Sequence, residues 1–329
     1  MYHLICIGDP VIDTHVQLAD DCAECRPLTA HTTHLCFEYG GKIPILDGFQ
    51  ALGGNAPNVA VGAVKLGLRT AVVATLGEDI NGKMAAEALQ KFGVSTDYVT
   101  YDAAAKTRYS IVLNYKAERT ILSFSDRKQY QWPKPFPETD WIYYTGLSAG
   151  FETVHQALLQ YLTKHPTVRL AVNPGSYLMK YARPPLQEVA FRADLLIVNK
   201  EEAEALTGDS AAAKKDTPGL VRALAAAGAK EVALTDGPRG AWAGSIDEIW
   251  RLESFPVAVV AKTGAGDAFT SAYLTARWNR HDIGHALQWG VANSCAVIQA
   301  HGPHQGLLDE AGIKKMIGQF PTIKPVLIP

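Results

Sequence analysis

Several features that define other protein classes are missing from this sequence of 329 residues. It contains no apolar run long enough to span a bilayer, and it lacks the Gly-x-x-x-x-Gly-Lys-Ser/Thr loop of the common nucleotidases. Its formal net charge of −2 offers no basic face for nucleic acid or an acidic membrane. The segment from Tyr2 to Gly8 is strand-like, with neither the basic start nor the length of a signal peptide. We therefore expect a cytoplasmic protein that binds neither nucleic acid nor membranes.

Cysteine is scarce as well, with five residues in the chain. An odd count without a secretion signal indicates reduced thiols. Two of them, Cys6 and Cys295, lie in apolar segments and are expected in the core. The other three lie near two histidines, in a cluster made of Cys22, Cys25, His31, His34 and Cys36. These residue types bind structural zinc, but the spacing is short for a zinc fold, so ordinary residues without a metal are the favoured interpretation.

What the chain does contain is a regular alternation of strand-like and helix-like segments. The segment from Thr70 to Leu76 is nearly continuously apolar, as a strand buried on both faces should be, and Gly93 stops the helical pattern after it. Further strands are predicted from Trp141 to Tyr144, Arg169 to Val172, Asp194 to Val198 and Glu231 to Thr235. This rhythm predicts an α/β fold with a mainly parallel sheet and helices on both faces. Ligands of such sheets bind beyond the carboxyl ends of the strands, where Asn173, Asn199 and Asp236 each follow a strand directly.

Two stretches, about residues 14–50 and 100–124, break this rhythm because they contain strands and turns without intervening helices. They could fold together as a small antiparallel sheet that projects from the main domain. Such a lid could close over a substrate and exclude water. Extra edge strands of the main sheet would produce the same pattern, so both interpretations stay open.

The strongest chemical signal is the segment from Thr263 to Phe269, which leads into an apolar helix. Gly264, Ala265 and Gly266 leave backbone N–H groups unobstructed at the helix N-terminus, where anions bind. A carboxylate in the same turn repels phosphate, so Asp267 is poorly placed for phosphate binding alone. It makes sense as a general base that takes the proton of an attacking hydroxyl. The alternative is a simple helix cap.

A second signal is the turn Gly53-Gly54-Asn55-Ala-Pro-Asn58, which opens a short helix that ends before Gly67. Paired glycines let a ligand approach the backbone closely, and Asn58 can hydrogen-bond a hydroxyl group. In isolation an ordinary glycine-rich turn between a strand and a helix is the favoured interpretation of this segment.

Together, the two motifs make the chain resemble the ribokinase-like sugar kinases, also called the pfkB family. The resemblance covers essentially the whole chain, and the family landmarks occur in the expected order. They are Gly8-Asp-Pro-Val-Ile-Asp13, Gly53-Gly54, Gly77-Glu-Asp79-Ile-Asn-Gly82, Asn173-Pro174, Asn199-Lys-Glu-Glu202, Thr235-Asp-Gly237 and Gly264-Ala-Gly-Asp267. The resemblance implies one ribokinase-like domain over residues 1–329, a three-layer αβα sandwich with a β-lid from about residues 14–50 and 100–124.

The same resemblance implies an ATP- and Mg²⁺-dependent kinase that phosphorylates a hydroxyl group of a sugar, with Asp267 as the base. A nucleoside kinase and a non-catalytic sugar- or nucleotide-binding regulator are the alternatives. The acceptor-binding residues would be Asp13, Gly53, Gly54 and Asn58. The nucleotide-binding residues would be Asn173, Asn199, Glu202, Thr235, Gly237 and Asn293, with Glu202 holding magnesium through water.

The sequence departs from the family in one place. Many relatives carry Asp-Thr before the catalytic turn, where this chain has Ala261 and Lys262. The missing aspartate helps ribokinase-like members to bind a monovalent cation, so we expect no activation by potassium, and we expect Lys262 to point into solvent. Exposed lid edges invite pairing, so a homodimer through the lid is also expected.

Overall fold

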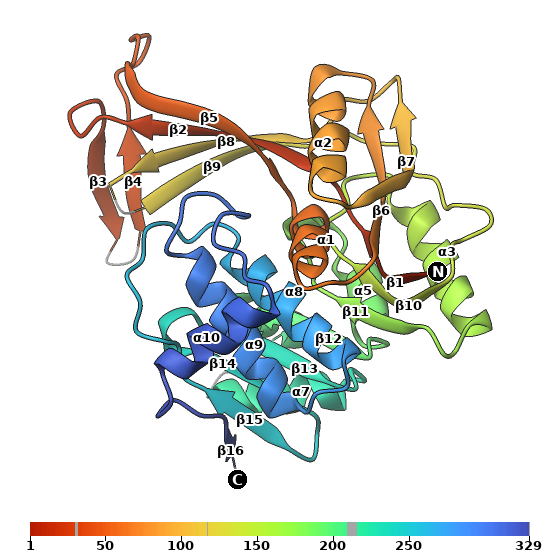
Figure 1. Ribbon diagram of the computed structural model, residues 1–329. Coiled ribbons are helices and arrows are strands. Elements are labelled where there is room, and N and C mark those ends of the chain that lie inside the picture. Colours follow the sequence, from red (N-terminus) through yellow and green to blue (C-terminus); the bar gives the residue numbers. More distant parts are fainter. Residues whose placement is uncertain (30–31, 117, 209–215, 329) are drawn as a thin grey trace.

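The computed structural model describes residues 1–29, 32–116, 118–208 and 216–328, and ten strands of this part form one main sheet (Figure 1). Seven neighbouring strands, from β13 to β7, run parallel, and β14 to β16 continue one edge in antiparallel fashion. In sheet order the strands are β16 (Val326–Ile328), β15 (Ile249–Leu252), β14 (Ala241–Gly244), β13 (Val232–Thr235), β12 (Leu195–Asn199), β11 (Arg169–Val172), β10 (Thr139–Tyr144), β1 (Tyr2–Ile7), β6 (Thr70–Gly77) and β7 (Ser95–Asp102).

Helices cover both faces of this sheet, because the central strands are apolar on both sides. Along β1, Leu4 and Cys6 enter one core while Ile5 and Ile7 enter the other. The first core is covered by α1 (Asn55–Lys65), α2 (Ile80–Lys91), α8 (Ala265–Trp278), α9 (Ile283–Val297) and α10 (Glu310–Gln319). The second is covered by α3 (Glu152–Lys164), α4 (Ser176–Tyr181), α5 (Arg183–Ala190), α6 (Lys200–Thr207) and α7 (Thr217–Ala226).

The fold class expected from the sequence is confirmed, since the sheet is mainly parallel and lies between two helical layers. The antiparallel edge formed by β14, β15 and β16 was not predicted. These strands have three or four residues each, which is too short for a recognisable alternation of apolar and polar positions.

Strands from both irregular stretches pair in a second sheet, which projects from the body in Figure 1 and which we call the lid sheet. Its order is β5 (Ile45–Gly53), β2 (Val11–Leu18), β8 (Tyr109–Tyr115) and β9 (Glu118–Phe124). Extra edge strands of the main sheet are therefore the wrong interpretation, except for residues 100–102, which belong to β7. The central pair, β2 and β8, is parallel, so the sheet is not wholly antiparallel. That the lid sheet closes over a substrate stays a prediction.

The cysteine cluster lies at the far end of the lid sheet, on and beside a hairpin of β3 (Glu24–Thr29) and β4 (Thr32–Cys36). Cys22, Cys25 and Cys36 are free thiols. Within the described ranges, no group of three potential ligands could hold a metal ion. His31 lies outside the described residues, so the expectation that the cluster holds no metal stays a prediction.

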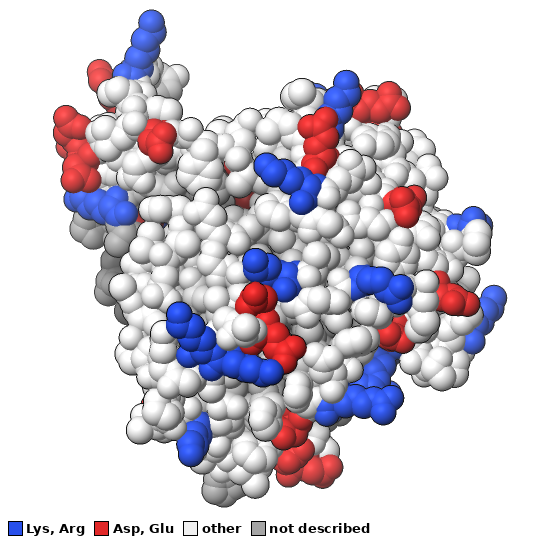
Figure 2. Space-filling model, in the orientation of Figure 1, with Lys and Arg blue, Asp and Glu red and all other residues white. Residues whose placement is uncertain are grey.

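Charges of both signs are interspersed on the face drawn in Figure 2, with uncharged surface between them. Among the described helices, none is long and apolar enough to cross a membrane.

Candidate active site

The catalytic turn predicted from the sequence is an abrupt entry into α8. Gly264 adopts a left-handed conformation with φ of 80°, and an added Cβ would lie 2.6 Å from Cα of Pro303. Only glycine fits such a backbone without strain. The N–H groups of Ala265, Gly266 and Asp267 then fall in the first turn of the helix, where they have no acceptor within the helix. The turn therefore presents donors and the positive end of a helix dipole to an anion.

Asp267 lies in this first turn and accepts a hydrogen bond of 2.7 Å from Nδ2 of Asn58. The carboxyl group keeps a partial opening to solvent, but protein surrounds it elsewhere. The pKa of Asp267 is raised to about 7, mainly by this desolvation; the Asn58 hydrogen bond opposes the shift, and the negative charges of Glu202 and Asp13 add to it. A carboxyl group with a pKa near neutrality is suited to general base catalysis.

Asn58 belongs to α1 and is buried, with a relative exposure of 6%. Its Nδ2 is engaged by Asp267, whereas its Oδ1 is buried without a hydrogen-bond partner. A buried oxygen without a hydrogen-bond donor costs free energy. Oδ1 of Asn58 could therefore accept a hydrogen bond from a hydroxyl group of the substrate. Asn58, predicted to bind the substrate, thus lies beside the predicted base Asp267 and also orients its carboxyl group.

Asp13 enters the same site from the lid sheet. It lies on β2 opposite Ser110 of β8, whose hydroxyl group hydrogen-bonds to it. Burial raises the pKa of Asp13, and Ser110, His15 and Arg108 oppose this shift. Gly53 faces the carboxylate so closely that an added Cβ would lie 2.1 Å from Oδ2 of Asp13.

The predicted nucleotide-binding residues lie on the other side of the turn. Thr235 and Gly237 line a pocket together with Ala265 and Gly266, and α9 closes it with Val291, Ser294 and Cys295. Thr235 also pairs with Asn199 across the neighbouring strands, which brings the end of β12 to the same edge.

Asn199 and Glu202 hold each other at the start of α6. Asn199 Oδ1 accepts from the backbone N–H of Glu202 at 2.8 Å, and Glu202 Oε2 accepts from the N–H of Asn199 at 3.0 Å. This capping box satisfies two N–H groups and fixes both side chains. Burial raises the pKa of Glu202. A water-bound magnesium ion would favour the ionised form, so the pair fits such an ion.

Two other residues predicted to bind the nucleotide, Asn173 and Asn293, form hydrogen bonds within the protein instead. Asn173 accepts from Asn55 at 2.8 Å and donates to the carbonyl group of Ile197 at 3.0 Å, so it ties α1 to the ends of two strands. Asn293 is fully buried, donates to Ala268 O and accepts from Leu308 N, both at 2.9 Å. Both residues support the site from behind, and their predicted contact with nucleotide stays a prediction that this bonding does not favour.

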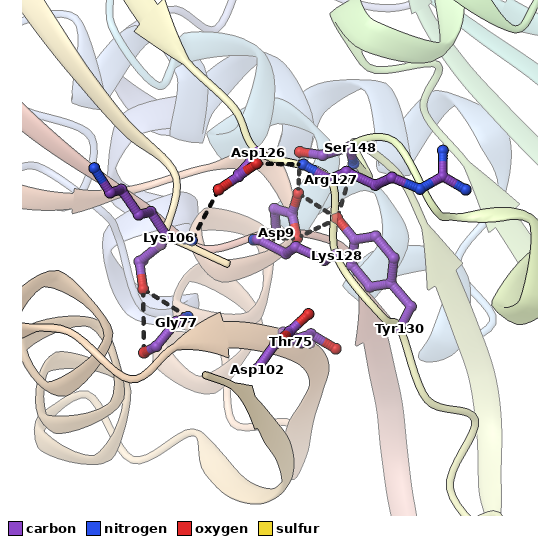
Figure 3. Close-up of polar contacts among 12 residues, drawn as sticks. Asp9, Thr75, Gly77, Asp102, Lys106, Asp126, Arg127, Lys128, Tyr130 and Ser148 are labelled. Carbon is purple, nitrogen blue, oxygen red and sulfur yellow. Dashed lines mark hydrogen bonds and ion pairs between the residues drawn. The ribbon is translucent and has the colours of Figure 1, made fainter. Parts of the chain in front are cut away.

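The sequence analysis missed a buried polar network at the end of β1, shown in Figure 3. Asp9 is 1% exposed and is surrounded by Lys128 Nζ at 3.1 Å, Ser148 Oγ at 2.6 Å and the Tyr130 hydroxyl group at 2.7 Å. The carbonyl oxygen of Asp9 lies 2.4 Å from where a Cβ of Gly54 would be, directly below the glycine turn. The network therefore anchors the floor of the acceptor site. Its one sequence signal is the pair Gly8-Asp9 in the first landmark.

A cavity of about 710 Å³ separates the lid sheet from the loop that precedes α8. His15 and Arg119 line it from the lid sheet, and residues 259–263 line it from the body. It borders the site without containing it, because its lining includes none of the residues proposed for acceptor binding or for the base. Lys262 crosses this gap to Glu118 of β9 at 3.1 Å, so it is exposed, as expected, but pairs with the lid sheet.

Comparison with known proteins shows the family of the chain. The chain matches the family described as pfkB family carbohydrate kinase over residues 46–310. It is 23% identical to 5-dehydro-2-deoxygluconokinase of Bacillus velezensis over 274 residues, which cover 78% of this chain and 82% of that protein. It is 29% identical to probable fructokinase-5 of Arabidopsis thaliana over 247 residues, which cover 69% and 74%. The solved structure of Arabidopsis thaliana ribokinase complexed with ribose and ATP superposes with a TM-score of 0.75 at 22% identity, over 96% of this chain and 98% of that chain.

The chain therefore belongs to the pfkB family of carbohydrate kinases, because the family match spans most of its length. The family resemblance, the ribokinase-like fold and the assignment as a kinase, all expected from the sequence, are confirmed.

Proposed function

We propose that this kinase transfers the γ-phosphoryl group of ATP to a hydroxyl group of a sugar, with Asp267 as the catalytic base. The observation that supports this most is the placement of one carboxylate, with a pKa raised to about 7, in the same helical turn as three free N–H groups. A base and an anion site in one turn are what phosphoryl transfer to an alcohol requires.

Each residue has a separate task in this proposal. The Asp267 carboxylate accepts the proton of the acceptor hydroxyl group, and Asn58 Nδ2 holds that carboxylate in place. The N–H groups of Ala265, Gly266 and Asp267 donate to negative charge that develops next to the base. Asp13 and the free Oδ1 of Asn58 accept hydrogen bonds from other hydroxyl groups of the acceptor.

ATP and Mg²⁺, when bound, supply the phosphoryl group and the positive charge that compensates its oxygens. Thr235 and Gly237 would contact the nucleotide, since they line the pocket beside Ala265 and Gly266. Glu202 would hold magnesium through water, because its Oε2 is engaged by the capping box and its remaining oxygen can accept from such a water. Asn199 keeps its Nδ2 for a phosphate oxygen, as only its Oδ1 is used.

A nucleoside acceptor is the second candidate, because the same hydroxyl-binding residues suit a ribose ring. A non-catalytic regulator is a poorer fit, since binding a sugar or nucleotide without turnover gives no reason to keep a buried carboxylate that opposes phosphate binding. Turnover of ATP with a panel of sugars and nucleosides separates these three functions.

Replacement of the base tests the mechanism. Asp267→Asn keeps the size and one oxygen of the side chain, so we expect turnover to fall by about 10²–10⁴-fold. ATP binding should survive or tighten, because a charge that repels phosphate is removed. Since the folded state raises the pKa of Asp267, its ionisation costs folding free energy as the pH rises through about 7. The variant avoids this cost, so it should fold.

A matched control is Asp309→Asn, which changes a carboxylate at the N-terminus of α10, outside the site. It should lose about 1 kcal/mol of stability at most through its cap and keep normal turnover. Near-normal turnover of Asp267→Asn would show that Asp267 is only a helix-capping residue, and the mechanism would be wrong.

Potassium independence is part of the proposal. Ala261 has no carboxylate for a monovalent cation, and Lys262 pairs with Glu118. We expect equal turnover in sodium and potassium salts at constant magnesium. A several-fold rise in potassium would contradict this.

A further inference from the structure

Arg108 is a cationic residue of the site that none of the roles above uses. It precedes β8 and lies two residues before Ser110, so the alternation of the strand places both side chains on one face. Ser110 is the direct partner of Asp13 across the pairing of β2 and β8. Arg108 therefore projects from the same face of the lid sheet as Asp13, and its charge lowers the pKa of that carboxyl group.

The guanidinium group reaches the edge of the main sheet where ligands bind. An added Cβ at Gly146, just after β10, would lie 3.9 Å from Nη1 of Arg108, and Cα of Gly175, just after β11, lies 4.0 Å from the same point. Arg108 thus spans from the lid sheet to the carboxyl ends of β10 and β11, which is the position of bound ligands in sheets of this kind.

Among residues 1–29, 32–116, 118–208 and 216–328, this guanidinium group forms no hydrogen bond or close ion pair, and Asp13 acts on it only at longer range. Its Nε is buried without a hydrogen bond, and it takes part in none of the ion pairs of the described chain. Lys128 shows the usual solution for a buried cation, since its ammonium group is paired with Asp9. Arg108 as a whole is partly exposed, but a buried N–H group without a partner is costly, so its Nε lacks an acceptor that a bound ligand can supply.

We propose that the acceptor is a sugar acid, whose carboxylate binds the guanidinium group of Arg108 while a hydroxyl group at its other end lies at Asp267. This inference rests on the proposed kinase function and specifies its substrate class. A guanidinium group presents parallel N–H donors that match the two oxygens of a carboxylate. Arg108 also offsets the repulsion between that carboxylate and Asp13. A hydroxyl group of a neutral sugar could accept from Nε–H, but it offers neither the negative charge nor the second parallel oxygen of a carboxylate.

Matched acceptors and variants test the inference. Phosphorylation is measured for gluconate and glucose, for ribonate and ribose, and for adenosine. Wild-type protein should favour the acid of each pair, and Arg108→Gln should lower kcat/KM for the acid about ten- to a hundredfold, with little change for the neutral sugar. Arg108→Lys, which keeps the charge but not the paired donors, should fall between the two. Arg127→Gln, an exposed arginine whose side chain points away from the Asp9 network in Figure 3, is the control and should behave like wild type.

Three outcomes would overturn the inference while the kinase function stands. The first is a preference of wild-type protein for neutral sugars or adenosine. The second is an equal loss on acidic and neutral acceptors in Arg108→Gln, because Arg108 would then only position Asp13. The third is measured by calorimetry if no acceptor of the panel is phosphorylated, with a non-hydrolysable ATP analogue and Mg²⁺ present. Wild-type protein should then bind gluconate, and Arg108→Gln should not. Gluconate binding to wild-type protein that is no stronger than glucose binding would overturn the inference. Failure of the proposed mechanism shows separately, as phosphorylation of an acceptor that is insensitive to Asp267→Asn.

Discussion

Asp267 and Asp13 are both carboxylates of the proposed site, but they belong to regions of very different construction. Asp267 stands on a helix of the body, in which α8 is mostly buried and neighbouring side chains are fixed by hydrogen bonds. Asp13 stands on the lid sheet, where β5 and β9 are largely exposed. The chemical step thus depends on the rigid region, while the acceptor is bound in part by the less buried one. Recognition residues on the lid sheet can change without altering the helix that carries the base, although the charge of Asp13 still influences the pKa of Asp267.

The largest effect is expected at Gly53, which ends β5 where the lid sheet joins the body. Gly53→Ala would place a Cβ 2.1 Å from Oδ2 of Asp13, so the carboxylate has to move. Overpacking of this kind costs about 1–3 kcal/mol, and we expect kcat/KM for the acceptor to fall about ten- to a hundredfold with ATP binding unchanged. Gly318→Ala in α10, where a Cβ meets no atom within 4 Å, is the control. Equal loss of ATP binding and acceptor binding in Gly53→Ala would contradict an effect on the acceptor alone.

The outer face of the lid sheet should bury itself against a second copy of the chain. Cross-strand pairing places Val16, Ile111, Leu113 and Leu122 on the face opposite to His15 and Arg119, and Leu122 is 54% exposed. Because exposed apolar strands pair readily, we expect a homodimer that Leu122→Asp converts to monomer. Sedimentation at micromolar concentration measures this. Leu327→Asp, a comparably exposed leucine on β16, should leave the dimer intact, and a wild-type monomer would rule the pairing out.

The pH profile of kcat/KM tests whether the charge of Asp13 on the lid sheet acts on Asp267 in the body. The base works only when ionised, so kcat/KM should fall as the pH drops below about 7, the pKa of Asp267. Asn58→Ala removes a hydrogen bond to the carboxylate and should move this limb to higher pH. Asp13→Asn removes a negative charge and should move it to lower pH. Opposite shifts in the two pH profiles are the expected result, and shifts in the same direction would show that the limb belongs to another group.

The smallest effect is expected at the direct contact between lid sheet and body. Lys262 and Glu118 are both exposed, and exposed ion pairs contribute little. Lys262→Met, Glu118→Gln and the double variant should each change kcat/KM by less than about fivefold, with the difference disappearing at high salt. A much larger loss in either single variant would mean that the pair closes the lid sheet during turnover.

Local features of the sequence were sufficient for much of this picture. The alternation of strands and helices along the chain, the two glycine turns and the proposed base in the Gly264–Asp267 motif depend on periodicity and on short spacings, which neighbouring residues determine. The second sheet was also foreseeable, since residues 14–50 and 100–124 lack helical periodicity. Its register was not, because no local signal specifies that β2 pairs with β8 across about ninety residues.

Which polar groups have partners could be known only from the folded chain. Asn173 and Asn293 follow the family pattern in sequence, yet their amide groups are used by Asn55, Ile197, Ala268 and Leu308. Lys128 looks like any surface lysine, yet it is buried against Asp9, whereas Nε of Arg108 is buried without a hydrogen bond. A hydrogen bond depends on distances between segments far apart in the chain. The residue types are therefore readable in the sequence, but their free donors and acceptors, and so their use in binding, become visible only when the chain is folded.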